Sequence, residues 1–441
     1  MDKLRIIVPS DSFVKERKYI VRVLFNTFLG LDYNIETSEE ATNHLIILPD
    51  NKRYIEINNG FRSSVFQEGS YLLKENIPAE IIELDTPFSE KAITGLFGDN
   101  QFQITDEKIY VGVDIFASAF FMLTRWEEYV NTERDEHSRF PAHESVAYKF
   151  NFLNRPIVDE YVEFIWNILT HEGYKGKRKK RHFEPVLTHD VDWLSKPFEG
   201  FRQFVGDIVK RFDFRSFYRR FNNQFIRNPY DTFDLLMDQS EKLGVKSRFY
   251  FMADPDGPQY YLNSSLFQKA IKKINDRGHI IGFHPGYQSY LNSKRWGKEK
   301  KRLEESLGKE ITEGRQHFLR FKVPETWNIW AENGIKTDST LGYADYPGFR
   351  CGTCHEYPVF DFIRKVELDL YERPLIVMEG TLFQHLQMDN YEAIERVKPL
   401  IDQVKRYRGK FVLLWHNSSF GDVYWSGYEK SYYKIIELLK Y

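Results

Sequence analysis

The chain is short of several features that define common protein classes. Only two of its 441 residues are cysteines, which excludes a disulfide-stapled secreted scaffold. No apolar run reaches the length of a membrane-spanning helix, about 18 residues, and the apolar residues 4–8 are too few for a secretory signal. Neither charge dominates, because the formal net charge is −2, which disfavours bulk electrostatic binding to nucleic acid. These absences predict a cytoplasmic protein with no membrane span and no nucleic-acid partner.

The two cysteines stand close together, as Cys351-Gly352-Thr353-Cys354-His355. This C-x-x-C-H spacing matches both c-type haem attachment and a redox dithiol. Haem attachment of that kind accompanies export, and no export signal is visible. A structural zinc site would need a second ligand pair, and the sequence has no second C-x-x-C motif. Ordinary loop cysteines are the favoured interpretation, with a redox or haem role as the alternative.

Patterning predicts two parts joined by a basic segment. Residues 1–174 mix short apolar runs with helical periodicity, which predicts a smaller α/β domain. Residues 175–182 begin with six Lys or Arg in seven positions, a composition typical of a solvated linker; contact with a phosphate or an anionic glycan is the alternative. In residues 183–441, strand-like runs alternate with helix-like stretches, which predicts a parallel sheet with crossover helices. The predicted strands are 186–188, 247–252, 279–283, 317–320, 376–379 and 411–415.

A parallel sheet of this kind suits an α/β barrel, in which the chemistry collects at the carboxyl ends of the strands. The run 188–192, Thr-His-Asp-Val-Asp, directly follows the apolar residues 185–187. Side chains alternate along a strand, so Asp190 and Asp192 start on the same face. Two such close carboxylates need a cation or a shared proton, which predicts one metal ligand and one general base. The alternative is a solvated turn after the strand.

Other predicted strands also run into polar residues. His284, Glu379 and His416 each follow an apolar run, and Arg315 and His317 share a face if their segment is extended. A single histidine in such a place is more often a hydrogen-bonded core or rim residue. Five predicted strand ends that carry carboxylate, imidazole or guanidinium groups instead favour a functional site where these side chains meet. Carboxylate and imidazole are the ligands of hydrolytic divalent metals, and a remaining Asp and His can serve as base and acid.

The half 183–441 resembles the NodB-type polysaccharide deacetylases, metal-dependent carbohydrate esterases and amidases on an irregular (β/α)7 barrel. The run 188–192 resembles the family's first motif, residues 278–284 the second, and residues 413–416 the last. The resemblance implies that Asp190 is the general base, that Asp192 and His284 bind the metal, and that His416 is the general acid. It also implies that Arg315 orients the base carboxylate.

The sequence departs from that family at one expected ligand. The second motif usually carries another metal-binding histidine, and Gln288 stands at that position. We predict that His317 replaces it; a decayed metal site is the alternative. The resemblance covers roughly the last 260 residues, and the chain as a whole resembles a bacterial subgroup with an uncharacterised N-terminal domain.

These features predict a hydrolase, with Zn²⁺ as the expected cofactor, that removes an acetyl group from an N-acetylated sugar or glycan precursor in bacterial surface-polysaccharide biosynthesis. Aromatic residues form 16% of the chain, and their faces suit sugar rings, although they more often fill a core. The predicted substrate contacts are Tyr287, Gln288, Glu379 and Trp415. Two alternatives stay open: a metal-free barrel that binds carbohydrate or a partner, and a related hydrolase that cleaves an ester or another C–N bond in a nucleotide sugar.

Overall fold

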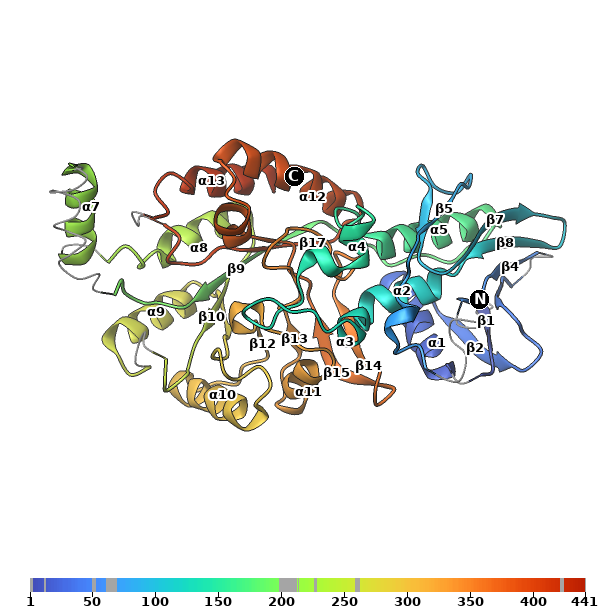
Figure 1. The fold of residues 1–441 in the computed structure, drawn as a ribbon, viewed down its shortest axis with the longest axis horizontal. Coiled ribbons are helices and arrows are strands. Elements are labelled where there is room, and N and C mark those ends of the chain that lie inside the picture. The colour runs from blue at the N-terminus through green and yellow to red at the C-terminus, as the bar shows by residue number, and fades with distance from the viewer. Residues whose placement is uncertain are drawn as a thin grey trace.

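A computed structural model gives the fold of the chain, with a smaller amino-terminal part beside a larger carboxyl-terminal one (Figure 1). No helix within its described ranges is long and apolar enough to cross a bilayer. The structure describes residues 3–11, 13–49, 53–60, 70–197, 212, 214–225, 228–257, 262–420 and 424–440.

The amino-terminal part is a mixed sheet covered by helices. Its six strands run in the order β2-β1-β3-β4-β8-β7, and β5 and β6 form a separate antiparallel pair. Helix α2 is buried along its whole length, and Asp114 caps it by accepting hydrogen bonds from the backbone N–H groups of Phe116 and Ala117. The strands are β1 (Leu4–Pro9), β2 (Tyr33–Ser38), β3 (His44–Ile47), β4 (Tyr54–Ile57), β5 (Ile82–Leu84), β6 (Ile93–Gly95), β7 (Gly98–Ile104) and β8 (Lys108–Val113). The helices are α1 (Val14–Val21), the π-helix η1 (Arg22–Phe28), η4 (Lys74–Asn76), α2 (Ile115–Thr124), α3 (Glu127–Val130), η5 (Ala142–Glu144), α4 (Val146–Lys149) and α5 (Ile157–His171).

The carboxyl-terminal part is a nine-stranded sheet in the order β14-β15-β13-β12-β11-β10-β9-β17-β16. Every neighbouring pair is parallel except β14 with β15. The strands are β9 (Glu184–Val191), β10 (Arg248–Phe251), β11 (Ile280–Phe283), β12 (Glu313–Gly314), β13 (Thr337–Asp338), β14 (Tyr357–Asp361), β15 (Val366–Glu372), β16 (Val377–Met378) and β17 (Lys410–Leu414). The helices are α7 (Phe214–Phe225), α8 (Phe233–Lys242), α9 (Ser265–Asp276), α10 (Ser293–Leu307), η6 (His317–Leu319), α11 (Glu325–Glu332), η7 (Thr381–His385), α12 (Asn390–Arg406) and α13 (Glu429–Leu438).

The predicted α/β class is confirmed, and the parallel pairing places strand β9 between β10 and β17. Strand β9 is buried from residue 185 onward, as expected for a strand covered on both faces. Within the described ranges no strand pairing closes the sheet. One backbone hydrogen bond nevertheless runs from Leu375 N, just before β16, to Leu341 O, shortly after β13, while Ile376 N donates to Val412 O of the neighbouring β17. The closed seven-stranded barrel stays a prediction.

One predicted strand is wrong. Residues 317–320 form a tight 3₁₀ turn, and the strand at this place is the two-residue β12 before it. Phe318 and Leu319 have φ values of 60° and 54°, in the left-handed region that a strand cannot use. The predicted reason for pairing Arg315 with His317, a shared strand face, therefore does not apply.

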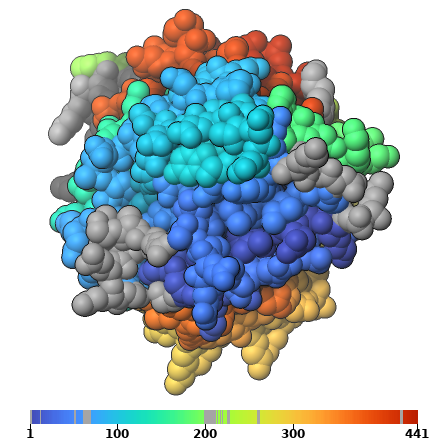
Figure 2. Space-filling view, turned by 90° about the vertical axis from the view of Figure 1, so that its right-hand side faces the viewer, coloured from blue at the N-terminus to red at the C-terminus, as the bar shows by residue number. Residues whose placement is uncertain are grey.

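The two parts share one hydrophobic core. The segment between them is held at two arginines, whereas its four lysines, Lys175, Lys177, Lys179 and Lys180, are exposed. Arg181 donates hydrogen bonds to the carbonyl oxygens of Thr27 and Phe28, and Arg178 pairs with Glu163 at 2.7 Å. Figure 2 views the molecule from the amino-terminal end, where blue and cyan atoms of the first part cover most of the face. The boundary at 175–182 thus separates two units of sequence but not two separately buried cores.

Candidate metal centre

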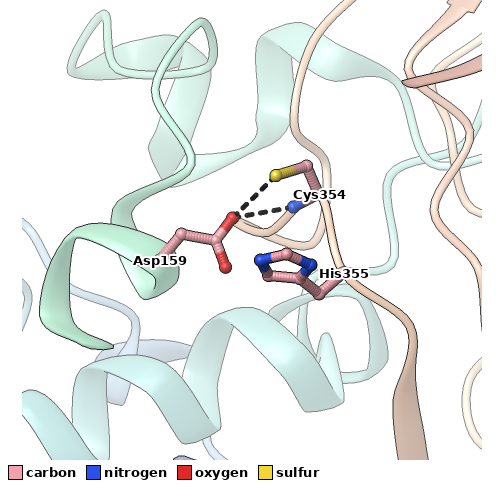
Figure 3. A group of neighbouring side chains, drawn as sticks. All are labelled: Asp159, Cys354 and His355. Atoms are coloured by element: carbon pink, nitrogen blue, oxygen red, sulfur yellow. Dashed lines mark hydrogen bonds between the residues drawn. The ribbon is translucent and has the colours of Figure 1, made fainter. Parts of the chain in front are cut away.

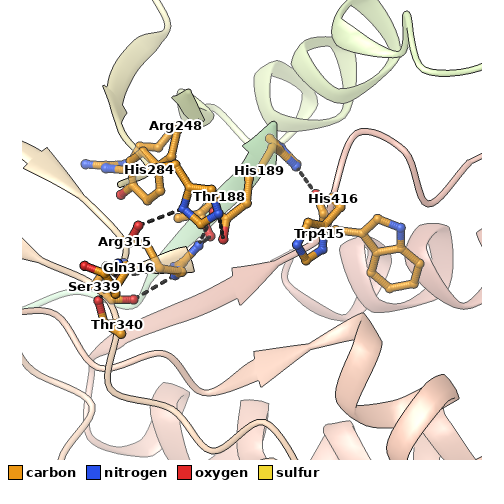
Figure 4. Close-up of polar contacts among 12 residues, drawn as sticks. Thr188, His189, Arg248, His284, Arg315, Gln316, Ser339, Thr340, Trp415 and His416 are labelled. Atoms are coloured by element: carbon orange, nitrogen blue, oxygen red, sulfur yellow. Dashed lines mark hydrogen bonds and ion pairs between the residues drawn. The ribbon is translucent and has the colours of Figure 1, made fainter. Parts of the chain in front are cut away.

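Strand β9 brings Thr188 and Asp190 to a buried arginine. Arg315 lies just beyond β12, and its Nη1 donates to Thr188 Oγ1 at 2.8 Å and to Asp190 Oδ1 at 2.9 Å (Figure 4). The arginine is itself held by the carbonyl oxygen of Ser339, which accepts from Nε at 2.8 Å. A fully buried guanidinium fixed at both ends can hold the Asp190 carboxylate in one orientation and balance its charge.

Asp192, His284 and His317 form a cluster with the spacing of a metal site. One oxygen of Asp192 lies 3.3 Å from His284 Nε2 and 3.7 Å from His317 Nε2. One ligand atom from each of the three residues lies within 4.8 Å of the other two. The structure therefore brings together the metal ligands expected from the sequence, although the turn rather than a strand carries His317.

The cluster has lone pairs that the described residues do not satisfy. His284 Nδ1 lies 2.7 Å from the carbonyl oxygen of Arg315, so it carries the proton and leaves Nε2 as an acceptor (Figure 4). His284 Nε2 and Asp192 Oδ1 are buried and have no hydrogen-bond partner among the described residues. Two acceptors facing each other in a buried site repel unless a proton or a cation lies between them. The donor set of one carboxylate and two imidazoles fits Zn²⁺ or a similar divalent ion.

The electrostatics of two of the three ligands, Asp192 and His317, agree with this assignment; for His284, burial would lower the pKa, but Asp190 and Asp192 outweigh burial and raise that pKa. Burial alone would raise the pKa of Asp192, but the nearby His317, His416 and His284 outweigh burial and lower that pKa. Burial lowers the pKa of His317 to about 4, against the opposing effect of Asp192. Asp192 is therefore ionised and His317 neutral near pH 7, which are the forms that bind a cation.

His416 lies across the cluster and is held by a buried glutamate. Its Nδ1 lies 2.6 Å from Glu379 Oε1, and its Nε2 is 3.8 Å from Asp192 Oδ2. Burial would lower the pKa of His416, but the charge of Glu379 and its hydrogen bond outweigh burial and raise that pKa to about 10. His416 is therefore protonated near neutral pH and can give up a proton from Nε2.

Glu379, predicted as a substrate contact, lines the cavity over the cluster and also holds His416. It is fully buried, and its Oε1 also accepts from the His416 backbone N–H at 2.8 Å and from Ser419 Oγ at 2.7 Å. Strand β16, which ends just before Glu379, pairs with β17, which ends just before His416. The sequence indicated that both residues follow strands, because each comes after an apolar run. It did not indicate that these two strands pair with each other.

The remaining predicted substrate contacts do not line this site. Trp415 is fully buried, and its ring packs 5.0 Å from that of Tyr432, so it fills the core and cannot stack on a sugar. Gln288 is exposed on the loop after β11 and is not one of the residues that line the cavity over the cluster. Tyr287 is half-buried beneath Arg320, whose guanidinium lies 3.9 Å above its ring.

A cavity of about 330 Å³ opens over the cluster. Asp190, Asp192, His284, His317 and His416 all contribute to its wall. Other lining residues come from distant segments, including Trp425 and, from the amino-terminal part, Glu136, His137 and Arg139. The loop that carries these three is fixed on the sheet half, because Arg320 Nε donates to His137 O at 2.9 Å. Sequence reasoning missed this contribution, since no motif marks the loop.

A second cluster, Asp159, Cys354 and His355, also has metal-ligand spacing (Figure 3). Its carboxylate is already used by the protein, because Asp159 accepts from Thr353 Oγ1 at 2.7 Å, from Cys354 N at 2.9 Å and from Cys354 Sγ at 3.1 Å. Burial raises the pKa of the Cys354 thiol well above its usual value. Both cysteines are buried and unpaired, which supports the loop-cysteine interpretation over a haem or redox role.

Comparisons with known proteins give two findings. A family model described as a family of unknown function (DUF7033) matches residues 5–174. No curated protein matches the chain.

The similar solved structures include polysaccharide deacetylases and their relatives. A protein named as a polysaccharide deacetylase from Mycobacterium smegmatis shares 17% identity, with a TM-score of 0.38 over 59% of this chain and 85% of that one. The Xyl-CE4 domain of a multidomain xylanase from the hindgut metagenome of Trinervitermes trinervoides shares 13%, with a TM-score of 0.27 over 59% and 82%. A CE4 family pseudoenzyme from Bacillus anthracis shares 9%, with a TM-score of 0.29 over 59% and 61%. At such identities the activity has to be inferred from the chain's own residues.

Proposed function

We propose that this protein is a metal-dependent hydrolase that removes an acetyl group from an N-acetylated sugar or glycan precursor. One observation carries the proposal: a three-ligand cluster, an arginine-held carboxylate and a glutamate-held histidine converge on one cavity. The proposal includes an irregular (β/α)7 barrel closed near residues 375–376, a cytoplasmic location and a role in surface-polysaccharide biosynthesis.

Zn²⁺ is the proposed cofactor, held by Asp192, His284 and His317. The unsatisfied buried acceptors and the neutral form of His317 support this choice over a magnesium-type ion, which prefers oxygen ligands. When bound, such an ion polarises a carbonyl and lowers the pKa of a coordinated water to about 7.

Asp190 is the proposed general base. Its Oδ1 is occupied by Arg315, and its Oδ2 lies 3.8 Å from His284 Nε2, so the second oxygen faces the cluster. A carboxylate positioned there can accept a proton from the attacking water. Because the guanidinium is buried and fixed, it can keep that carboxylate aligned throughout the reaction.

His416 is the proposed general acid. Glu379 fixes its Nδ1 and keeps the ring protonated, which leaves the Nε2 proton for the departing amine. Asp190 lies beside His284 and His416 lies beside Asp192, so base and acid are separate groups at the cluster, which is the division that amide hydrolysis needs. The cavity of about 330 Å³ has polar walls, and we propose that it takes the N-acetylated sugar unit.

The test is metal analysis and acetate release on protein purified without chelator. Near-stoichiometric zinc, with acetate released from chitin oligosaccharides or from a uridine-diphosphate N-acetylated sugar, supports the proposal. Asp190→Asn is the matched control, because it should keep the metal and lose acetate release. Absence of metal after zinc loading would favour the metal-free binding barrel instead. Bound zinc with cleavage of acetate esters only would favour the ester hydrolase.

A further inference from the structure

His317 lacks the fixed partner that the other two histidines at the site have. His284 Nδ1 lies 2.7 Å from the carbonyl oxygen of Arg315, and His416 Nδ1 lies 2.6 Å from Glu379 Oε1. His317 Nδ1, in contrast, is buried and has no hydrogen-bond partner among the described residues. A metal-binding histidine is normally oriented by a hydrogen bond from its second ring nitrogen. The orientation of the His317 ring therefore depends on the backbone that carries it and on the rings around it.

The backbone that carries His317 is held in an unfavourable conformation. Phe318 and Leu319, the next two residues, have φ values of 60° and 54°. Side chains of this size rarely adopt the left-handed region, and they keep it only where their surroundings hold them there. The turn has two backbone hydrogen bonds of its own, from Leu319 N to Gln316 O at 3.0 Å and from Arg320 N to His317 O at 3.2 Å. We therefore looked for contacts that hold the turn from outside.

Such contacts come from a loop of the amino-terminal part, residues 135–139, which we call the clamp loop. The chain between α3 and α4 extends over the carboxyl-terminal part, and there it reaches the turn (Figure 1). Arg139 Nη1 donates to Phe318 O at 3.3 Å, and Arg320 Nε donates to His137 O at 2.9 Å. The rings of His137 and Phe318 lie 4.7 Å apart. Each side donates one hydrogen bond to the other, so the clamp loop and the turn hold each other in place.

The clamp loop is itself held in one conformation. Asp135 Oδ1 accepts from the backbone N–H groups of His137 at 2.9 Å and Arg139 at 2.8 Å, and Asp135 Oδ2 accepts from Arg139 Nε at 2.6 Å. The backbone closes the same loop, because Asp135 N donates to Arg139 O at 3.0 Å. Arg139 is only 9% exposed. Its planar guanidinium has donors in fixed directions, so one side chain joins Asp135 to the turn.

We infer that the clamp loop positions the metal ligand His317, with Arg139 as the positioning residue. The amino-terminal part then completes the metal centre, because it holds the one ligand whose ring has no hydrogen-bonded partner among the described residues. This role rests on the proposed function, since it needs the metal that His317 would bind. Groups that orient a metal ligand typically contribute about 10–100-fold to metal affinity.

The test compares metal-stripped full-length variants with the wild type. Arg139→Ala should weaken zinc affinity by about tenfold or more in isothermal titration, and it should change the absorption spectrum of the cobalt-loaded protein, which reports ligand geometry. In the metal-free protein, the amides of Leu319 and Arg320 should exchange hydrogen at least about tenfold faster, because the turn that protects them has lost its clamp.

Arg139→Lys is a milder variant for the same measurements. It keeps the positive charge but replaces the planar fork by a single nitrogen, which cannot join Asp135 to Phe318 O in the same way. Its zinc affinity should fall between those of the wild type and Arg139→Ala. If Arg139→Ala does not fold, Arg139→Lys takes its place, with slower loss of protection in the turn but the same direction of change.

Arg155→Ala is the matched control. Arg155 donates to Glu160, Thr94 and Ala92, all in the amino-terminal part, so its loss removes a similar set of hydrogen bonds without touching the turn. It should bind zinc as the wild type does. The inference is overturned if Arg139→Ala keeps wild-type zinc affinity, if the turn amides exchange at unchanged rates, or if Arg155→Ala weakens zinc binding equally. A wild type that binds no zinc would overturn the proposed function instead, and exchange in the metal-free protein would still decide whether the clamp loop holds the turn.

Discussion

At the scale of single residues, the cluster depends on which side chain supplies the third ligand. His317 points its Nε2 at Asp192 from 3.7 Å, whereas Gln288 is exposed and does not line the cavity over the cluster. Imidazole is also a better ligand for zinc-like ions than a neutral carboxamide oxygen.

We therefore predict that His317→Ala weakens zinc affinity as severely as His284→Ala, by about 100-fold or more, while Gln288→Ala leaves it unchanged. Isothermal titration of the metal-stripped variants with zinc measures this directly. If Gln288→Ala lost the metal and His317→Ala kept it, the assignment of the third ligand would be wrong.

Glu379 offers a second test at the residue scale, because it acts through His416. Glu379→Gln should keep the hydrogen bond to Nδ1 but remove the charge that keeps the ring protonated. We expect kcat to fall by about 100-fold, within the usual contribution of a general acid, with zinc content unchanged.

Ser419→Ala serves as the control for Glu379→Gln, because it removes one hydrogen bond to the same carboxylate without changing its charge. It should cost less than about tenfold in kcat. Equal losses in the two variants would show that packing around Glu379 matters and its charge does not.

At the scale of secondary-structure elements, the sequence predicted the long periodic segments well and the irregular ones poorly. Strands β9, β11 and β17 follow from their apolar runs. The turn at His317–Leu319 does not, because its apolar residues look like a strand while Phe318 and Leu319 take left-handed backbone angles. The position of Glu379 beside His416 depends on the pairing of β16 with β17, which involves residues far apart in the sequence. Neither the turn nor this pairing can be predicted from the pattern of neighbouring residues in the sequence.

The basic segment gives the element-scale prediction. Arg181 donates to the carbonyl oxygens at the end of η1, where a helix has unpaired acceptors and a negative dipole end. Arg181→Ala should lower the free energy of unfolding by about 1–3 kcal/mol, as expected for hydrogen bonds from a charged group. Lys180→Ala, the exposed neighbour, should change it by less than about 0.5 kcal/mol. Chemical unfolding of the two variants decides between an anchored segment and a solvated linker, which would give two equally small effects.

At the scale of the whole molecule, the two parts meet through buried charge that the sequence does not reveal. Glu128 of α3 accepts from Arg350 Nε at 2.9 Å and from Arg350 Nη2 at 2.5 Å, and it also pairs with Arg125 at 2.9 Å. All three residues are 2% exposed or less. The sequence indicated two units, because its pattern of apolar residues differs between them. A contact between residues 128 and 350 cannot be predicted in this way, because it joins residues far apart in the sequence. The same is true of the loop that brings His137 to the cavity.

This network predicts how the stability of the whole molecule depends on Glu128. Glu128→Ala should leave the buried Arg350 guanidinium without its carboxylate, while Arg125 keeps Glu127, and should lower the free energy of unfolding by about 3–5 kcal/mol. Glu133→Ala, which removes an exposed carboxylate a few residues away, is the control and should have little effect. Equal unfolding midpoints for the two variants would mean that the network contributes nothing to joining the parts.

The same carboxylate predicts a pH dependence of definite sign. Burial would raise the pKa of Glu128, but Arg350 and Arg125 outweigh burial and lower it from 4.5 to about 2. Because the folded-state pKa lies below the unfolded value, the ionised carboxylate stabilises the fold above about pH 4.5, and this contribution is lost as the pH falls toward 2. Glu128→Gln cannot ionise, so the difference in unfolding free energy between the wild type and this variant should be largest near neutral pH and should shrink between about pH 4.5 and pH 2. Urea unfolding of both proteins across this range measures the difference, and a difference that stays constant would show that the charge of Glu128 does not hold the two parts together.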